Sequence, residues 1–239
     1  MIINSSHIEY IEGVVEVADS LGIESIIVEP NRIRGMCTNA EIFILQEKDV
    51  PDFPFGSIAF NRIAVFKLRH AAVKALSPTY EVVQHTTEFE GKPMLYVRSI
   101  NMASKRVKVD FRCANPITIK SPKAVLQPIL YVIPHISVWL DTLIKGFQAM
   151  GEDLVTFSQD GADLSIILRD KNNDEFKINI LDDAGLSTTG SDNDFSFNFH
   201  AKILINTLKR VKIDSLNLTE GGMIQTVVNN LNVYIKPVV

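Results

Sequence analysis

Long apolar runs and cysteine clusters are both missing from this 239-residue chain. No apolar run reaches the ~20 residues that a membrane-spanning helix needs, so we expect no membrane association. The N-terminal residues lack the basic and apolar regions of a signal peptide, which predicts a cytoplasmic protein. The two cysteines, Cys37 and Cys113, fall in different segments and fit no metal-ligand spacing. We expect both to be reduced thiols, with a disulfide as the alternative.

Catalytic and nucleotide-binding motifs are missing as well. The sequence has no G-x-x-x-x-G-K-[ST], H-E-x-x-H, G-x-S-x-G or C-x-x-C pattern, and its five histidines are scattered. Residues 170–174 begin like a calcium loop, but Glu175 stands where glycine is needed and Leu181 where a bidentate glutamate is needed. We therefore expect no enzyme activity, no catalytic or metal-binding residue and no cofactor. An unrecognised hydrolase or nuclease site is the alternative.

The charge balance argues against a protein that simply coats nucleic acid. Lys and Arg number 24 against 28 Asp and Glu, which gives a formal net charge of −4. Hydrophobic residues make up 46% of the chain and charged residues 22%, as is typical of a folded protein. A chain of this length can hold two domains, each with its own core.

The chain repeats one pattern in its two halves. Residues 5–46 and residues 135–181 both have the order amphipathic helix, glycine, strand, turn, strand. Gly22 closes the first helix and Gly151 the second, as C-terminal caps prefer. The repeat predicts two like domains, 1–114 and 128–239, joined by a proline-containing connector at 115–127.

Local patterns give the expected elements. In the first helix Ser6 and Glu9 form a capping-box pattern, and the apolar face consists of Ile8, Ile11, Val15 and Ala18. Most other segments alternate and are rich in β-branched and aromatic residues, including residues 80–89, which read as one strand. The strands are too short and too closely spaced for crossover helices, so the sheets should be antiparallel and the fold class α+β.

Each half also has a basic helix, expected at 60–75 and at 199–213. Each of these helices carries four cations and no acid, which favours a positive surface facing phosphates over an ordinary solvated face. The first helix has the opposite character, with Glu9, Glu12, Glu16, Asp19 and no base. Such acids should point away from phosphates or towards a neighbouring cation.

Three stretches carry a resemblance to a known family: residues 140–168, 192–205 and 229–239. They resemble the helix–strand–turn–strand opening, the strand entering the last helix, and the closing strand of a DNA sliding clamp. The chain is most similar to the trimeric clamp of T-even-type tailed phages, and also to the proliferating cell nuclear antigen family. The resemblance implies two similar clamp domains, each with two helices packed on antiparallel sheets, assembled into a closed ring. That ring would be a homotrimer in the host cytoplasm if phage-encoded.

The resemblance also implies partners and residue roles. The partners are duplex DNA bound without sequence specificity, a replicative DNA polymerase and an ATP-dependent clamp loader. The helices would line the hole with the candidate DNA-binding residues Arg62, Lys67, Arg69, Lys74, Lys145, Lys202, Lys209, Arg210 and Lys212.

Two further sets of residues follow from the same resemblance. Strands 106–113 and 174–183 would pair between subunits through the opposite charges of Arg106, Lys108, Arg112, Asp174, Glu175, Asp182 and Asp183. A pocket for partner peptides would involve Ile117, Ile119, Val125, Leu126, Pro237, Val238 and Val239. The alternatives are ordinary internal strands for the first set and packing of the domain junction for the second. For the whole chain, the alternative is a non-enzymatic structural or assembly protein of a phage particle.

Overall fold

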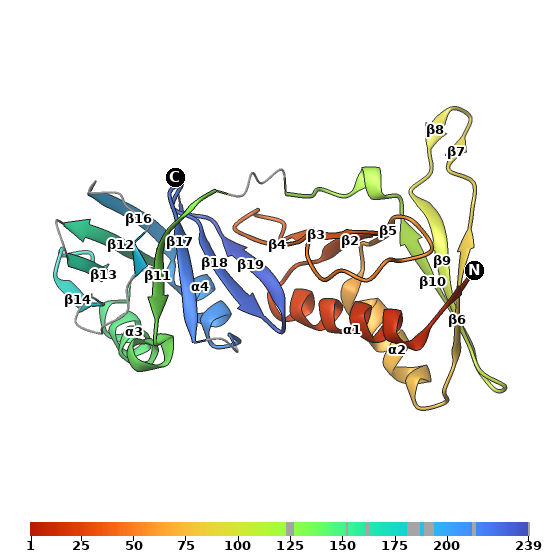
Figure 1. Ribbon diagram of the computed structural model, residues 1–239, viewed down its shortest axis with the longest axis horizontal. Coiled ribbons are helices and arrows are strands. Elements are labelled where there is room, and N and C mark those ends of the chain that lie inside the picture. Colours follow the sequence, from red (N-terminus) through yellow and green to blue (C-terminus); the bar gives the residue numbers. More distant parts are fainter. Residues whose placement is uncertain are drawn as a thin grey trace. The chain divides into compact units, whose positions relative to one another are not determined.

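Two units make up the chain, Met1–Lys123 and Ala124–Val239. The computed structural model describes residues 1–122, 127–151, 153–160, 163–180, 187–188, 194–211 and 214–238 (Figure 1). Both units combine two helices with antiparallel strands, as the local sequence patterns predict.

The first unit packs helices α1 (Ser5–Ser20) and α2 (Ile63–Lys74) beside each other (Figure 1). One run of its sheet has the order β5-β2-β3-β4 and the other has the order β1-β6-β9-β10. The runs meet where Ala59 pairs with Ala114. The strands are β1 (Ile2–Ile3), β2 (Ser25–Glu29), β3 (Arg32–Met36), β4 (Ile42–Gln46), β5 (Ile58–Phe60), β6 (Thr79–Gln84), β9 (Tyr96–Ala103) and β10 (Lys108–Ala114). A small hairpin, β7 (Glu88–Phe89) and β8 (Lys92–Pro93), and a 3-10 turn at Pro116–Thr118 complete the unit.

The second unit contains α3 (Ile136–Met150) and α4 (Ala201–Leu208), which contact each other. Its four-stranded sheet has the order β14-β13-β12-β16, and its other sheet contains the run β15-β11-β17-β18-β19. The strands are β11 (Ile129–Pro134), β12 (Leu154–Asp160), β13 (Asp163–Arg169), β14 (Glu175–Asn179), β15 (Ser187–Thr188), β16 (Phe195–His200), β17 (Ser215–Thr219), β18 (Ile224–Val228) and β19 (Leu231–Ile235).

The two units share one topology. The run β5-β2-β3-β4 of the first unit matches β16-β12-β13-β14 of the second, and β1-β6-β9-β10 matches β11-β17-β18-β19. In each unit the first helix enters the first run and the second helix leaves it. The duplication that the sequence suggests is therefore a repeat of the complete fold, and the predicted α+β class is confirmed.

The helix ends confirm one prediction and correct another. Gly22 and Gly151 follow α1 and α3 with φ angles of +70° and +71°, which glycine adopts without strain. The capping box at Ser6 is wrong. Asn4 is the N-cap, and its Oδ1 accepts from the His7 N–H at 2.9 Å, while Ser6 already lies in the first turn. Both Asn and Ser are strong caps, so the local sequence leaves more than one candidate for this position.

Three predicted boundaries also change. Residues 80–89 are not one strand, because β6 ends at Gln84 and β7 pairs with β8 in a separate hairpin turned at Glu90 and Gly91. The basic helices are shorter than expected, at Ile63–Lys74 and Ala201–Leu208. The segment before α4 pairs with β12 as strand β16, and this pairing delays the start of the helix.

Each unit has an aromatic core beneath its helices. In the first unit the rings of Phe60, Phe66 and Phe111 lie 4.9–5.8 Å apart, which ties α2 to β5 and β10. In the second unit Phe157 meets Phe199 edge to face at 5.5 Å, and Leu143 of α3 is fully buried in the same core. The predicted apolar face of α1 is buried as well.

Glycine 146 allows α3 to approach the edge strand β14. A Cβ at this position would lie 2.5 Å from the Phe176 ring and 3.0 Å from Leu168. Gly146→Ala should therefore lower the free energy of unfolding by ~1–3 kcal/mol, because overpacking forces these side chains to move. Urea unfolding followed by circular dichroism measures the change.

Gly13→Ala is the matched control in α1. Its added Cβ would meet no atom within 4 Å, so the higher helix propensity of alanine should stabilise the protein by up to ~1 kcal/mol. Equal midpoints for the Gly146→Ala and parent proteins would contradict the close approach of α3 to β14.

Candidate nucleic-acid interface

Cations of α2 contact acids of α1. Lys67 Nζ lies 2.7 Å from Asp19 Oδ2, and Lys74 Nζ lies 2.7 Å from both carboxylate oxygens of Glu12. The hydrogen bond to Asp19 raises the pKa of Lys67, and the hydrogen bond to Glu12 raises the pKa of Lys74. Two acids of the first helix thus face neighbouring cations, as the sequence suggested. The positive charge of α2 is therefore partly neutralised at its exposed surface.

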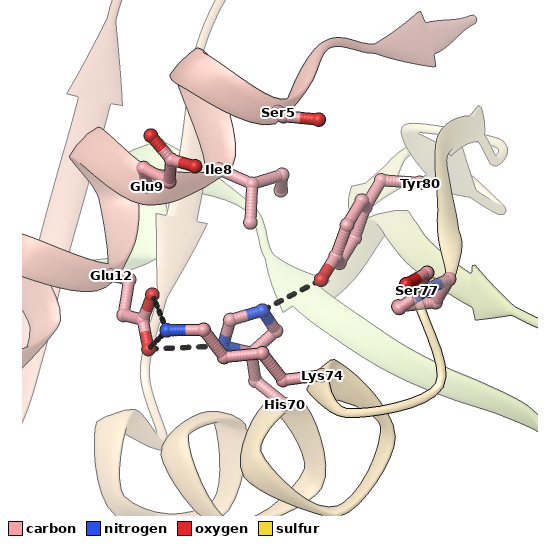
Figure 2. A pocket seen from close by; sticks show the side chains of 9 residues that line it. Ser5, Ile8, Glu9, Glu12, His70, Lys74, Ser77 and Tyr80 are labelled. Carbon is pink, nitrogen blue, oxygen red and sulfur yellow. Dashed lines mark hydrogen bonds and ion pairs between the residues drawn. The ribbon is translucent and has the colours of Figure 1, made fainter.

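Behind this ion pair is a cleft of about 370 Å³ between α1, α2 and the start of β6. Figure 2 shows Glu12 facing both Lys74 and His70, and Tyr80 facing His70 from the other side. His70 Nε2 lies 2.8 Å from the Tyr80 hydroxyl, and Nδ1 lies 3.7 Å from Glu12 Oε1. Burial lowers the pKa of His70, which keeps the ring neutral between its aromatic neighbours.

Arg69 of α2 and Arg62, the N-cap of this helix, both turn towards strand β10. Arg69 donates to the Asp110 carbonyl at 2.8 Å and Arg62 to the Arg112 carbonyl at 3.2 Å. The Arg62 guanidinium also lies over the rings of Tyr96 and Phe111, at 5.4 and 5.3 Å from their centroids. Arg62 and Arg69 therefore join α2 to the strand beside it.

The cations of the second unit are less engaged. The exposed face of α4 and the turn after it contain Lys202, Asn206, Lys209 and Arg210. Arg210 donates to the Asn206 carbonyl, while Lys202, Lys209 and Lys145 of α3 have no acid within ion-pair distance among the described residues. Lys212 lies outside the described residues. The exposed charge of α4 is thus available to a ligand.

Strand β10 lies at an open edge. It pairs with β9 along its whole length but with β5 only at Ala114, so Lys108–Cys113 have no second strand neighbour among the described residues. In the β9–β10 turn the Ser104 N–H donates to the Val107 carbonyl at 2.8 Å. Hydrogen-bonded pairs alternate along an antiparallel ladder, so every second residue of β10 points its backbone groups away from β9. These residues are Lys108, Asp110 and Arg112.

Strand β14 is the end strand of the four-stranded sheet, so one of its sides has no strand neighbour among the described residues. Its ladder with β13 is bounded by the bonds from Asp170 N–H to the Asp174 carbonyl, 3.0 Å, and from Ile180 N–H to the Leu164 carbonyl, 2.9 Å. The same alternation leaves the backbone groups of β14 open at every second position. The open positions are Glu175, Lys177 and Asn179.

The remaining interface candidates lie around these strands. Arg106 is exposed in the β9–β10 turn, and the Asp174 N–H donates to Asp170 Oδ1 in the β13–β14 turn. Asp182 and Asp183 lie outside the described residues. Sequence reasoning missed Asp110 and Lys177, although the period of two that places Lys108, Arg112 and Glu175 on the open edges would have found them. The interface role of the whole set stays a prediction.

The candidate pocket residues fall in both units. Ile117 is 74% exposed in the 3-10 turn, and Ile119 packs against Ile27, Ala59 and Ala114. In the second unit Val238 N–H donates to the Asn198 carbonyl at 2.7 Å, which fixes the chain beside Pro237. Val125, Leu126 and Val239 lie outside the described residues, and the pocket stays a prediction.

Both cysteines are free thiols, as expected, and both are buried. Burial raises the pKa of Cys113 to about 12. Across the described part of the chain, no group of three or more His, Cys, Asp and Glu residues could hold a metal ion. In that same part no helix combines the length and the apolar character needed to cross a bilayer.

Solved structures of PCNA and of bacterial β sliding clamps share this architecture. PCNA from Thermococcus kodakaraensis matches at a TM-score of 0.59 and 11% identity, over 100% of this chain and 99% of that chain. PCNA from A. fulgidus, bound to the C-terminal region of FEN-1, matches at 0.58 and 12%, over 97% of this chain and 96% of that chain. The β sliding clamp of C. crescentus matches at 0.63 and 9%, and the chain covers 64% of its length.

This chain has the DNA sliding-clamp fold. The match extends from end to end in the PCNA structures, so both repeated units belong to it. No protein-family model and no curated protein sequence matches the chain. At a sequence identity of 9–12%, the likeness to these solved structures shows the fold alone.

The buried His70 should make the stability of the clamp fold depend on pH. Its pKa is lowered in the folded state, so below the ordinary histidine pKa of ~6.5 the unfolded chain binds a proton that the folded chain does not. The free energy of unfolding should therefore fall as the pH falls below ~6.5. His70→Gln should flatten this dependence, measured by urea unfolding from pH 7.5 to 5.

Tyr80→Phe is the control for His70→Gln. It removes the hydrogen bond to His70 but keeps the imidazole, so it should lower stability and retain the pH dependence. Parallel pH profiles for the parent and His70→Gln proteins would show that another group is responsible.

Proposed function

We propose that this chain is a DNA sliding clamp. Three copies would form a closed, non-enzymatic ring that encircles duplex DNA and confers processivity on a replicative DNA polymerase. The observation that carries the proposal is the end-to-end match to a PCNA protomer, over 100% of this chain and 99% of that chain. The size of the protomer supports a trimer of two-domain chains, as in the clamps of T-even-type tailed phages. A phage clamp would act in the host cytoplasm.

The DNA would be held by topology and by a few phosphate contacts. Lys202 of α4 and Lys209, the C-cap of this helix, have no acid partner among the described residues, so they can meet phosphates directly. Lys67 and Lys74 of α2 start from ion pairs with Asp19 and Glu12 and would contribute less. Contacts to phosphates carry no sequence information, so the ring could slide.

Protein partners would bind the ring through short peptides. The A. fulgidus PCNA structure contains the C-terminal region of FEN-1, and a polymerase peptide could bind this chain in the same manner. Ile117 is exposed and Ile119 half-buried, so both offer apolar surface to such a peptide. The sequence has no P-loop, so ring opening would depend on an ATP-dependent clamp loader. Tethering would raise the effective concentration of the polymerase at its template.

The first test is the molar mass in solution, measured by light scattering over a wide range of concentration. A mass three times that of the 26.7 kDa chain, falling on dilution, is the expected result. A strict monomer at every concentration would remove the self-assembled ring.

Topological binding gives the second test. Protein mixed with nicked circular DNA, at concentrations where the ring opens and recloses, should remain with the DNA in high salt and be released when the circle is cut. Equal retention on linear and circular DNA would contradict encirclement.

The α4 cations should dominate the electrostatic part of DNA binding. Lys202→Gln with Lys209→Gln should weaken binding to short duplexes and reduce the slope of log K against log salt by about 0.9 for every phosphate contact that the ring of three copies loses. Filter binding at several salt concentrations measures this slope, and light scattering checks that the ring still forms.

Lys67→Gln with Lys74→Gln is the matched control. It removes the same formal charge from α2 but leaves Asp19 and Glu12 unpaired, and it should change the salt slope less than the α4 variant. A larger loss of slope in the α2 variant would reverse the assignment.

A further inference from the structure

The Glu12 carboxylate of α1 is shared by two side chains of α2. Lys74 Nζ lies 2.7 Å from both carboxylate oxygens, and His70 Nδ1 lies 3.7 Å from Oε1 (Figure 2). We propose that Glu12, His70 and Lys74 form a proton switch that controls how strongly Lys74 binds a DNA phosphate. The inference rests on the proposed DNA-facing role of α2 and specifies how that surface is regulated.

The charge of this cluster changes when His70 gains one proton. While the imidazole is neutral, the charges of Glu12 and Lys74 cancel. With an imidazolium, one carboxylate faces two cations, and the cluster has one net positive charge. The Nδ1–H can then donate to Glu12, and repulsion between the two cations weakens the hold of Glu12 on Lys74. The Lys74 side chain is 57% exposed, so a released ammonium group is accessible to a phosphate.

The surroundings of His70 suit both protonation states. The residue is only 3% exposed, but it lines the cleft of about 370 Å³ between α1, α2 and β6, through which a proton can reach the ring. The Tyr80 hydroxyl lies 2.8 Å from Nε2. A hydroxyl donates to the neutral ring and accepts from the N–H of an imidazolium. Protonation of His70 therefore leaves no buried nitrogen of the ring without a partner.

Groups on the neighbouring elements set the balance between the two states. Burial lowers the pKa of His70, Glu12 raises it and Lys74 lowers it. Glu9 of α1 and Tyr80 of β6 also line the cleft. Strands β9 and β10 pack against α2 as well, but among the described residues only Glu12 and Lys74 are charged groups that act on His70. Because Lys74 opposes protonation, its removal to a phosphate favours the uptake of a proton by His70.

Binding of DNA and binding of the proton are therefore coupled in both directions. A phosphate that takes Lys74 leaves the Glu12 carboxylate beside the imidazole, where its negative charge stabilises the imidazolium. By thermodynamic linkage, protonation of His70 strengthens DNA binding by the same factor. The affinity for DNA should therefore rise as the pH falls.

The other ion pair between these helices provides an internal control. Lys67 Nζ lies 2.7 Å from Asp19, and among the described residues no histidine lies within ion-pair distance of Asp19. This pair contains no group whose ordinary pKa is near neutral pH. Lys67 should therefore contribute equally to DNA binding at each pH of the test.

The test compares the parent protein with His70→Gln. Binding of a short fluorescent duplex is measured by anisotropy at constant salt from pH 7.5 to 5.0. Over this range the affinity of the parent should rise about fivefold or more beyond the rise of His70→Gln, a factor typical of coupling between two sites. The other four histidines are common to both proteins, so their titration cancels in the comparison.

Further variants identify the groups of the switch. In the parent background Lys74→Gln should cost more DNA affinity at pH 5.0 than at pH 7.5, and in the His70→Gln background the cost should be equal at both. Glu12→Gln removes the shared acceptor, so it should raise the affinity at pH 7.5 and abolish the rise that depends on His70. Asp19→Asn is the matched control, because it frees Lys67 and should raise the affinity at pH 7.5 while keeping that rise.

Light scattering and urea unfolding check that each variant assembles and folds at the pH values used. Glu12→Gln provides the same test if His70→Gln does not fold. Parallel pH profiles for the parent and His70→Gln, or an equal cost of Lys74→Gln at every pH in the parent, would overturn the switch and leave the proposed clamp standing. A parent protein that binds no duplex at any pH would overturn both.

Discussion

The structure depends on one constraint, which is that each sheet buries one face under a pair of helices. In the first unit Phe66 of α2 packs between Phe60 and Phe111, and in the second Gly146 lets α3 approach Phe176. Burial of about 25 cal/mol per Å2 of apolar surface makes this the main source of stability. Once the apolar faces are covered, the outer faces of the helices and the edges of the sheets are left for other molecules.

Charge is distributed over these remaining surfaces unevenly. The acids of α1 meet the lysines of α2, so the first unit neutralises much of its own basic helix. Arg69 of the same helix and Arg62 at its N-cap donate to carbonyls of β10. The basic helix α4 of the second unit contacts α3 instead. Among the described residues of α3, Asp141 is the only acidic one, so α4 has no acidic helix beside it. The segments 60–75 and 199–213 each contain four cations in sequence, but their described cations are neutralised to different extents.

The open strand edges are charged as well. An unpaired edge strand is a liability in a monomer, and charged side chains on it restrict which partners it accepts. The open positions of β10 are Lys108, Asp110 and Arg112, and those of β14 are Glu175, Lys177 and Asn179, so both edges carry charged side chains. The β10 carbonyls accept hydrogen bonds from Arg69 of α2 and from Arg62 at its N-cap, so this open edge is tied to a helix of the proposed DNA-facing surface.

The sequence by itself determined the repeat, the α+β class, the apolar face of α1 and the helix ends at Gly22 and Gly151, because hydrophobic period and glycine conformation are local properties. It also determined that α2 and α4 are basic. It could not determine which cations are neutralised, since the pairing of Lys67 with Asp19 joins residues far apart in the chain. It could not determine the N-cap at Asn4, because Asn4, Ser5 and Ser6 are all good capping residues, or the end of β6 at Gln84, because residues 80–89 have one continuous strand-like pattern. Only the tertiary structure decided that β10 and β14 are edges and which of their residues point outward, because strand order and hydrogen-bond parity arise from long-range pairing.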